Sequence, residues 1–412
     1  MRHVILNDEE LRILIISQYF WPENFRINDV ALGLKERGHK ITILTGKPNY
    51  PKGRYFDGYS FWKRNSENWN GIKIYRTNLL LRGDSGGLRL FLNYFSFAIL
   101  ASIRLLFIPT NFDRIFVFAP SPITQGIPGI VAKYRFKAKN FLWIHDLWPD
   151  SVRISGGIKN EYILSGIDMM TKLIYRMSYK LLIQSKGFIK YLTKQNVSLS
   201  KIIYYPFYAE SFYKPELVEN DFKNNLTSEF TLIFAGNIGE SQSFNTLIDC
   251  ACALRNDGYR INWLIFGDGR LKDLVKKRIE NLALSAYFKL MGSYPATVMP
   301  KFYSCADGLV VSLKRSEIFS VTIPGKLQSY LACGKPIIGS LDGIGAEIIK
   351  EANAGFVGSA ESVNELKDAV IKLFNLSVDE RLQLGNNARQ YYEREFEREY
   401  LLDKLECILL DK

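Results

Sequence analysis

The sequence predicts an α/β protein made of two domains of similar design. With 412 residues, the chain is long for a single hydrophobic core and of ordinary length for two domains. Near-continuous apolar runs alternate with amphipathic stretches in both halves, which is typical of parallel sheets covered by helices. An apolar content of 47% and a charged content of 23% exclude a disordered or fibrous chain. We therefore expect a doubly wound parallel sheet in each half.

The first half shows this alternation from its start. The run RILIISQYF (12–20) predicts a buried strand, and KITILTG (40–46) predicts the next one. Between them, INDVALGLKERGH (27–39) predicts an amphipathic helix that ends near Gly38. Three later runs that lead into loops are also expected to be strands: 113–122, 140–150 and 180–188.

Residues 88–109 form a long apolar segment in this half. Arg89 and Arg104 enclose an apolar centre of about 14 residues, which is too short to span a bilayer. We expect a helix here that is either buried in the domain or in contact with a membrane surface.

The second half repeats the scheme. Its expected strands lie in FTLIFAGN, INWLIFGDG, YFKLMGS, GLVVSL and KPIIGSL, and the chain from Val378 onward is strongly helical. The intervening aromatic and charged segment has no clear periodicity and is interpreted as a linker. The expected organisation is a first domain at 1–205, a linker at 206–228, a second domain at 229–385 and a C-terminal helix at 386–412, which could cross back to the first domain.

Positive charge is concentrated in the first half. Residues 1–205 carry 30 Lys and Arg against 14 Asp and Glu, whereas residues 206–412 carry 24 against 28. This asymmetry indicates that the first half meets a polyanion, either an anionic membrane surface or a nucleic acid, although part of the charge serves solubility. No RNA-binding or helix-turn-helix signature accompanies the charge, so a membrane surface is favoured and no nucleic acid is expected.

The cysteines and the N-terminal residues indicate the cellular compartment of the protein. Five cysteines, an odd number without any C-x-x-C pair, indicate free and mostly buried thiols in a reducing environment. The opening MRHVILNDEELR contains three acidic residues and no apolar core, unlike a secretory signal. We expect a cytoplasmic protein, peripheral on the cytoplasmic face of the inner membrane.

Four loops after strands of the second half each suit part of a nucleotide diphosphate. Taken singly, each loop is a weak signal, because glycine turns follow strands in every α/β protein. The candidate donor-binding residues in these loops are Gly236, Asn237 and Gly239; Gly267, Asp268 and Gly269; Thr322, Lys326, Gln328 and Ser329; and Gly345 and Glu347.

The first of these loops raises a question of charge. FAGNIGESQSF (234–244) offers backbone amides at a helix start, but it contains Glu240 and no Lys or Arg. The sequence also lacks G-x-G-x-x-G, a P-loop and D-x-D, and it has only three histidines. We therefore expect no metal and no cofactor. The charge of a diphosphate must then be balanced by amides and by a side-chain cation from another segment.

Two segments of the first half carry further candidate residues. WIHDLWPDS places His145 and Asp146 at the end of a strand, where a catalytic role competes with simple capping of a turn by Asp146. FWPENFR (20–26) places Glu23, Asn24 and Arg26 after the first strand, and we interpret them as acceptor-binding residues.

Several segments together resemble a known family. These segments are QYFWPENFR, ALGLKERGH, GKPNYPKG, NYFSFA, HDLWPDS, FAGNIG, FGDG, SLKRSEIFSVTIPGKLQSYLACGKPIIG and GIGAEII. They run from about residue 12 to the C-terminus. With these motifs the chain resembles the GT-B-fold, retaining glycosyltransferases of family 4, and within them the WbuB-like subgroup of L-fucosamine transferases.

The resemblance implies a fold and a reaction. The fold is two Rossmann-like domains that face a central cleft. The reaction is transfer of a sugar, N-acetyl-L-fucosamine in this subgroup, from a UDP-sugar to an undecaprenyl-diphosphate-linked saccharide, with retention and without a metal, in O-antigen or capsule assembly. His145 and Asp146 would position the sugar and the acceptor, although the subgroup often has Arg where His145 stands.

The chain departs from the wider family at two points. Many members carry Arg and Lys in the loop that corresponds to 237–243, and many carry two Glu seven residues apart, the second of which falls on Ser329 here. In the subgroup's TIPGK, Lys326 is then the implied cation for the donor diphosphate. Two other functions stay open: a GT-B-fold UDP-sugar 2-epimerase, which needs no basic half that faces lipid, and a basic nucleic-acid-binding protein.

Overall fold

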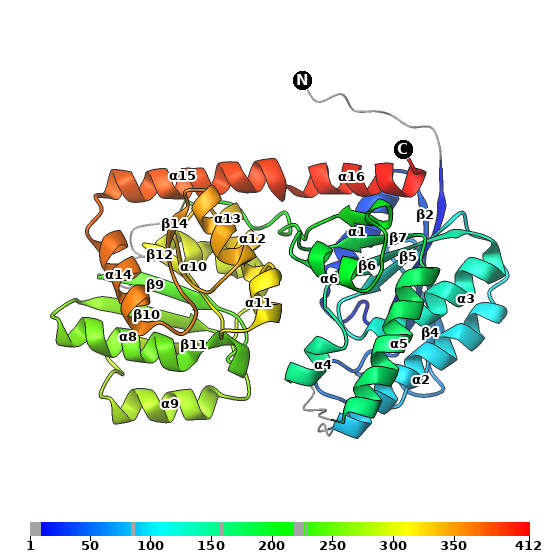
Figure 1. Cartoon of the computed structure of the whole chain (residues 1–412), viewed down its shortest axis with the longest axis horizontal. Coiled ribbons are helices and arrows are strands. Elements are labelled where there is room, and N and C mark those ends of the chain that lie inside the picture. Colours follow the sequence, from blue (N-terminus) through cyan, green and yellow to red (C-terminus); the bar gives the residue numbers. More distant parts are fainter. Residues whose placement is uncertain (1–9, 84–86, 156–159, 218–225, 227–228) are drawn as a thin grey trace. The chain divides into compact units, whose positions relative to one another are not determined.

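The computed structural model describes residues 10–83, 87–155, 160–217, 226 and 229–412. The chain divides into two compact units: Met1–Tyr205 with Leu402–Lys412, called the N-domain below, and Pro206–Leu401, called the C-domain. Each domain contains one sheet with helices on both faces (Figure 1). All strands run parallel except the edge strand β3. The expectation of two Rossmann-like α/β domains is confirmed.

The N-domain sheet has eight strands in the order β3-β4-β2-β1-β5-β6-β7-β8. The strands are β1 (Arg12–Ser17), β2 (Lys40–Gly46), β3 (Ser66–Trp69), β4 (Ile72–Thr77), β5 (Arg114–Ala119), β6 (Lys139–Ile144), β7 (Lys180–Ile183) and β8 (Ile202–Tyr204). The helices are α1 (Ile27–Glu36), α2 (Gly87–Leu106), α3 (Gly126–Phe136), α4 (Asp150–Ser155), α5 (Glu161–Met177) and α6 (Phe188–Lys194).

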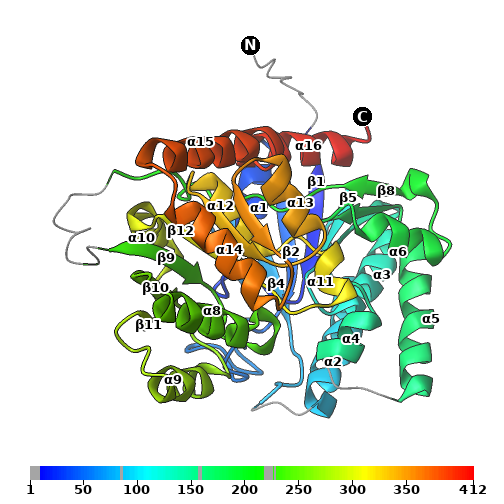
Figure 2. The same cartoon turned by 60° about the vertical axis from the view of Figure 1, so that its left-hand side comes forward.

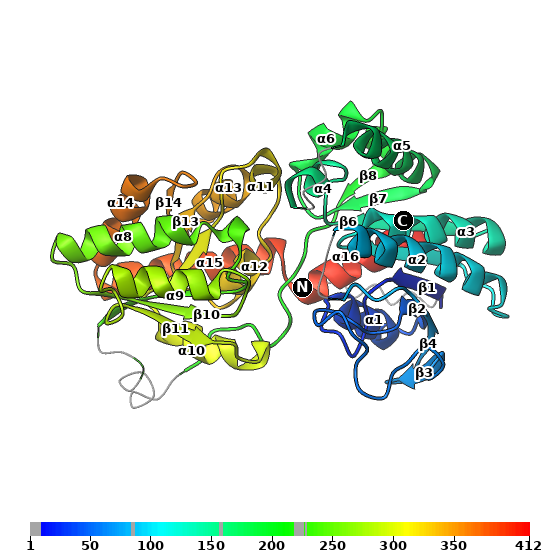
Figure 3. The same ribbon diagram turned by 90° about the horizontal axis from the view of Figure 1, so that it is seen from below.

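Both faces of this sheet are covered, which explains the near-continuous apolar strands. Ile13, Leu14, Ile15 and Ile16 of β1 are all fully buried, because the helices lie on both sides of the strand. Figure 3 shows α2 and α3 along one face and α1 on the other, and Figure 2 shows α3 between α2 and α5. The chain order reverses where β1 lies between β2 and β5, the position at which such sheets bind ligands.

Helix α2 has two different sides. Its buried residues are Asn93, Phe97, Ala98, Ala101 and Leu105, whereas several large apolar side chains are exposed: Leu88, Leu92, Ile99, Ile103 and Leu106. Within the described chain, α2 alone is long and apolar enough to cross a membrane by length and composition, and 28% of its apolar window is buried. The sequence left two alternatives for this helix, burial in the domain or contact with a membrane surface. The structure shows that one does not exclude the other. One side of α2 packs in the domain while the other leaves apolar groups uncovered.

The end of the chain belongs to the N-domain. Two helices, α15 (Val378–Glu395) and α16 (Arg398–Leu410), follow each other where the sequence predicts one helical stretch, and from Leu402 the chain is part of the N-domain (Figure 1). Leu402 packs on α1 at Gly33, where a Cβ atom would lie 2.5 Å from a Leu402 methyl carbon. An ion pair of 2.7 Å between Arg37 and Asp403 supports the same contact.

The C-domain sheet has six parallel strands in the order β11-β10-β9-β12-β13-β14. The strands are β9 (Phe230–Ala235), β10 (Ile261–Phe266), β11 (Phe288–Gly292), β12 (Gly308–Ser312), β13 (Ile337–Ser340) and β14 (Gly355–Gly358). The helices before α15 are α8 (Phe244–Asn256), α9 (Lys272–Asn281), α10 (Met299–Cys305), α11 (Glu317–Val321), α12 (Gly325–Ala332), α13 (Ile344–Glu351) and α14 (Val363–Phe374).

The C-domain core forms two layers, one on each face of the sheet. Leu232 and Phe234 of β9 belong to the layer under α8, α9 and α14, whereas Ile233 belongs to the layer under α10, α12, α13 and α15. Successive residues of a strand point to opposite faces, so both sets must be apolar. Residues 218–225 and 227–228 of the predicted linker lie outside the described residues. Its first part belongs to the C-domain, in which Tyr208 and Ala209 are buried.

Candidate functional site

The predicted site residues fall into two groups, one in each domain. In the C-domain, the loops after β9 and β10 are joined through their backbones. The amide of Gly236 donates to the Phe266 carbonyl at 2.9 Å, and that of Ile238 donates to the Asp268 carbonyl at 2.8 Å. A Cβ atom on Gly267, whose φ is +140°, would lie 1.9 Å from the Gly236 oxygen, so only glycine fits there.

This loop contact changes which amides can bind a ligand. The amides of Gly236 and Ile238 are used between the loops, whereas those of Asn237 and Gly239 have no hydrogen-bond partner in the part of the chain that the structure describes. Gly239 is buried and Asn237 is exposed. Two of the four predicted amides therefore remain to act on an anion at this turn.

Lys326 reaches this turn from the start of α12. Its ammonium donates to the Gln242 side-chain oxygen at 2.6 Å and lies 3.6 Å from the centre of the Phe234 ring. The nitrogen is 3.1 Å from the position that a Cβ atom on Gly236 would occupy. Burial lowers the Lys326 pKa to about 7. The structure thus places a cation beside the turn that has none of its own.

Asp268 lies at the tip of the second glycine loop. Its exposed carboxylate accepts hydrogen bonds from the Gly269 amide at 2.8 Å and from Lys272 at 3.3 Å. The Gly269 amide and then Lys272 lower the pKa of this carboxyl group. Asp268 is therefore ionised and open to solvent, as a ligand-binding acceptor would be.

The polar side chains before and within α12 are less accessible than the sequence suggests. The Thr322 hydroxyl donates to the Ile318 carbonyl at 2.7 Å. Gln328 is fully buried, with its amide oriented to donate to the Pro324 and Gly325 carbonyls at 3.1 Å, and Ser329 is 5% exposed. Thr322 and Gln328 therefore form hydrogen bonds within the segment itself.

The fourth loop packs against this segment. Gly345 lies in the first turn of α13, where a Cβ atom would approach the Pro324 ring to 3.1 Å. Glu347 is exposed in the same turn, and its amide donates to the Gly343 carbonyl at 2.9 Å. The starts of α12 and α13 therefore pack against each other.

In the N-domain, His145 and Asp146 follow β6. The His145 ring contacts Phe118 and Trp143, with ring centres 4.7 and 4.3 Å apart. Burial, and then the charge of Arg26, lower the His145 pKa well below its usual value, so the imidazole is neutral at pH 7. The Arg26 charge therefore acts on the residue that follows β6.

Asp146 accepts a hydrogen bond from the Ser151 hydroxyl, and burial raises its pKa. The carboxyl group lies in the wall of a cavity of about 120 Å³. Most of the other residues in this wall come from α2 and from α4: Gly87, Leu90, Phe91, Tyr94, Ser151 and Val152; Trp148 adds to the wall from the loop before α4. Asp146 thus faces open space within the N-domain rather than only capping a turn.

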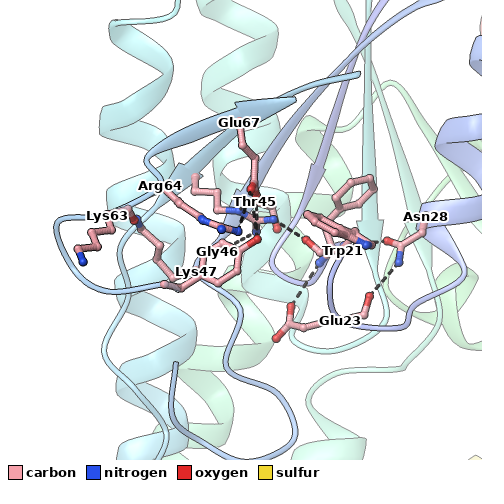
Figure 4. Close-up of polar contacts among 12 residues, drawn as sticks. Trp21, Glu23, Asn28, Thr45, Gly46, Lys47, Lys63, Arg64 and Glu67 are labelled. Carbon is pink, nitrogen blue, oxygen red and sulfur yellow. Dashed lines mark hydrogen bonds and ion pairs between the residues drawn. The ribbon is translucent and has the colours of Figure 1, made fainter. Parts of the chain in front are cut away.

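Glu23 is held differently from the exposed Asn24. It is 2% exposed, and its carboxylate accepts the Asn49 and Tyr50 amides at 2.8 and 2.7 Å. The neighbouring Asn28 side chain accepts the Trp21 amide and donates to the Glu23 carbonyl (Figure 4). Burial raises the Glu23 pKa to about 7. Glu23 joins the loops after β1 and β2, which is a structural role that its position in FWPENFR does not reveal.

Several residues of these sites were not predicted from the sequence. Phe234 and Gln242 both lie in the stretch 234–244, yet nothing in the stretch shows that they face Lys326. In the N-domain, the fully buried Arg76 pairs with Glu67 and donates to the Gly46 and Trp21 carbonyls. An arginine in a short polar strand gives no sequence signal of such a position.

Comparison with known proteins places these sites in context. Residues 218–391 match the family model "Glycosyl transferases group 1". The chain is 23% identical over 342 residues to WcaI of Escherichia coli K12, a candidate colanic acid biosynthesis glycosyl transferase, covering 79% of this chain and 82% of WcaI.

Solved structures share the fold over almost the whole chain. Sucrose-phosphate synthase of Thermosynechococcus elongatus has a TM-score of 0.76 at 15% identity, covering 98% of this chain and 99% of that one. HepE of Anabaena, solved with UDP and glucose, has a TM-score of 0.70 at 13% identity, covering 98% and 100%. The chain therefore combines the GT-B fold with a group 1 glycosyltransferase domain at residues 218–391.

Proposed function

We propose that this protein transfers a sugar from a UDP-sugar to a polyprenyl-diphosphate-linked saccharide, with retention, in bacterial surface-polysaccharide assembly. The proposed sugar is N-acetyl-L-fucosamine and the proposed carrier is undecaprenyl diphosphate. The similarity to WcaI supports a role in polysaccharide synthesis, and the similarity to HepE, solved with UDP and glucose, supports a UDP-sugar donor.

One observation carries the proposal: the Lys326 ammonium lies beside the glycine turn after β9. A diphosphate bound at this turn would meet the free amides of Asn237 and Gly239 and the partly buried ammonium of Lys326. An anion there would favour the charged form of Lys326 and would displace Gln242 as its partner.

The same contact explains how the reaction is accelerated. As the bond between the sugar and the diphosphate breaks, negative charge grows on the leaving group, so Lys326 binds the transition state more strongly than the substrate. In the N-domain, the neutral His145 and the carboxyl group of Asp146 would orient the acceptor hydroxyl. The departing phosphate then takes the acceptor proton.

We also propose that the reaction needs no metal ion. In the described ranges of the chain, no group of three or more His, Cys, Asp or Glu side chains is close enough to hold one. The cationic charge that a metal would supply is available from Lys326 instead.

The acceptor class implies a membrane, and we propose that the N-domain meets its anionic inner surface. Exposed apolar residues of α2 lie in the same domain as the basic residues Lys133, Arg135, Lys137 and Lys139. Apolar side chains that enter the interface and cations that attract anionic lipid are the two contributions that hold peripheral proteins.

A thermal-shift panel of UDP, GDP and dTDP tests the donor assignment. Ligand stabilisation grows as RT ln(1 + [L]/Kd), so UDP should raise the Tm clearly above the other two nucleotides. The shift should be equal with Mg²⁺ and with EDTA. A larger shift with GDP or dTDP would reject the UDP assignment, and loss of the shift in EDTA would reject metal independence.

A further inference from the structure

A second cationic site lies in the N-domain, apart from every residue considered above for catalysis. Arg82 follows β4, and its guanidinium carbon lies 5.7, 5.2 and 5.9 Å from the ring centres of Tyr19, Tyr50 and Tyr94. One guanidinium nitrogen donates to the Tyr19 hydroxyl at 2.5 Å, whereas Nε is buried without a hydrogen-bond partner in the described structure. The tyrosine rings hold the guanidinium group without neutralising it.

Arg89, in the first turn of α2, places a second guanidinium group beside Gly83, the next residue after Arg82. A Cβ atom on Gly83 would lie 2.7 Å from the Arg89 Nη1 atom, so Arg89 packs on the residue that follows Arg82. Neither arginine forms an ion pair with a carboxylate among residues 10–83, 87–155, 160–217 and 229–412. Among the described residues, therefore, neither guanidinium group has a carboxylate partner.

The backbone around them is held in place. The Gly83 amide donates to the Gly53 carbonyl at 3.2 Å, and a Cβ atom on Gly53, whose φ is +68°, would lie 2.2 Å from the Gly83 oxygen. This close approach fixes the loop after β4 against the loop after β2. The charge pair is thus built on a rigid backbone contact, as a binding site requires.

Two neighbouring features suggest what the charges bind. Tyr94, one of the rings around Arg82, also lines the cavity into which Asp146 points, and Phe91 and Trp148 add further aromatic walls. On the outer side of α2, the apolar Leu88 and Leu92 flank Arg89 and are exposed by 73% and 41%. Three features therefore lie around the start of α2: an aromatic cavity with a carboxyl group, a pair of arginines and an apolar surface.

We propose that Arg82 and Arg89 bind the diphosphate of an isoprenoid-diphosphate acceptor. Guanidinium groups pair with phosphate through two parallel hydrogen bonds, and two of them match the two phosphates. The adjoining cavity at Asp146 takes the sugar next to the diphosphate, and Leu88 and Leu92 contact the first isoprene units. This inference rests on the proposed function, because it assigns the acceptor class of the same reaction.

The test uses farnesyl diphosphate as a soluble probe, with farnesol and inorganic pyrophosphate as its two halves. Titration calorimetry on the full chain should show farnesyl diphosphate binding more tightly than either half. Arg82→Gln and Arg89→Gln should each weaken its binding about tenfold or more, because each removes a charge-assisted contact. Arg176→Gln is the matched control, since it removes an exposed guanidinium group in the last turn of α5, which is part of neither the proposed site nor the basic patch.

UDP titrations separate this inference from the proposed function. Lys326→Ala should weaken the binding of UDP and leave the binding of farnesyl diphosphate unchanged. Arg82→Gln should weaken the binding of farnesyl diphosphate and leave the binding of UDP unchanged. Equal binding of farnesyl diphosphate by the wild type and both arginine variants, or loss of its binding in Lys326→Ala, would overturn the acceptor site. Failure of the wild type to bind UDP would instead reject the donor half of the proposed function. Thermal unfolding of the arginine variants, followed by circular dichroism, should match that of the wild type and shows that both of their domains are folded.

Discussion

The two domains hold positive charge beside glycine turns in different ways. In the C-domain, the turn at Gly236 meets one lysine whose pKa is lowered to about 7 by burial. In the N-domain, the contact between Gly53 and Gly83 is flanked by arginines, which keep their charge at any pH a protein meets. The difference teaches that the C-domain turn can lose its neighbouring charge as the pH rises above 7, whereas guanidinium groups stay charged.

The two domains also differ in the charged residues that they bury near these turns. The N-domain buries Arg76 completely and pairs it with Glu67, and next to them Lys47 is also buried and donates to the Lys63 carbonyl (Figure 4). Burial, and then the charge of Arg76, lower the Lys47 pKa to about 8. The C-domain turn has no comparable network in its described residues. The N-domain loops should therefore depend on buried charge for stability, and the C-domain loops on backbone contacts.

The largest expected effect is the loss of stability when the buried charge of Arg76 is removed. Arg76→Met should lower the free energy of unfolding by about 3–5 kcal/mol, because it leaves Glu67 and two backbone carbonyls without their partner. Urea denaturation followed by tryptophan fluorescence measures it. Arg64→Met is the control, since Arg64 is half exposed and 3.9 Å from the same carboxylate, and it should cost less than about 1 kcal/mol. Equal effects would show that the buried pair adds nothing.

The next effect concerns catalysis in the C-domain. Lys326→Ala should lower kcat/KM roughly 100-fold or more, about 3 kcal/mol, with a smaller loss of UDP affinity, because the contact strengthens as the diphosphate leaves. Lys326→Arg should recover part of the activity, since it keeps the charge but not the geometry. Steady-state kinetics with the donor identified by the nucleotide panel measures both. Near-normal transfer by the alanine variant would place the cation elsewhere, with Arg270 the next residue to test.

Membrane binding should respond to charge in one domain only. Arg135→Gln combined with Lys137→Gln should weaken binding to anionic vesicles by about 2 kcal/mol, at roughly 1 kcal/mol for each charge near the surface, and raised salt should reduce the difference. Lys276→Gln with Lys277→Gln removes two exposed charges of the C-domain and should change little. Flotation that responds equally to both pairs would show that the N-domain patch is not the contact.

The smallest effect is a pH dependence that only the lysine site should show. Since the Lys326 pKa is about 7 in the free protein, the side chain is mostly neutral at pH 8 and must take up a proton when it binds a diphosphate. The UDP affinity should therefore fall about tenfold from pH 8 to pH 9, or 1.4 kcal/mol. Calorimetry on Lys326→Arg should show no such fall, because arginine stays protonated. The same pH dependence in both proteins would assign it to another group.

Much of the fold could be predicted from the sequence. The apolar runs that become β1, β2, β5, β6, β7 and β9 to β13 all lie where strands were expected, because strands covered on both faces must be apolar throughout. The hairpin of β3 and β4 was not expected, since its strands are short and polar on one side. Residues 378–412 were predicted as helical, but their division into α15 and α16 at Phe396 was not.

The candidate site was predictable in part. Glycine turns after strands, and a lysine at a helix start, can be located in the sequence, because strand ends and helix starts have recognisable residues. The sequence does not show which side chains meet at these turns. Glu23 looks like an exposed loop acid, yet it is buried and holds two amides of another loop. Arg82 gives no motif at all, and only its three tyrosine neighbours, from three separate segments, mark it as a site.

By itself, the sequence determined two parallel-sheet domains, a basic first half, and loops with spare amides but no cation at residues 236–241. These properties depend on local patterns of apolarity, glycine and charge. The tertiary structure alone decided that Lys326 reaches Gly236 across 90 residues, and that Phe234 and Gln242 receive it. Contacts of this kind arise where separate strands end at one edge of a sheet, and their geometry depends on packing between segments that no local pattern records.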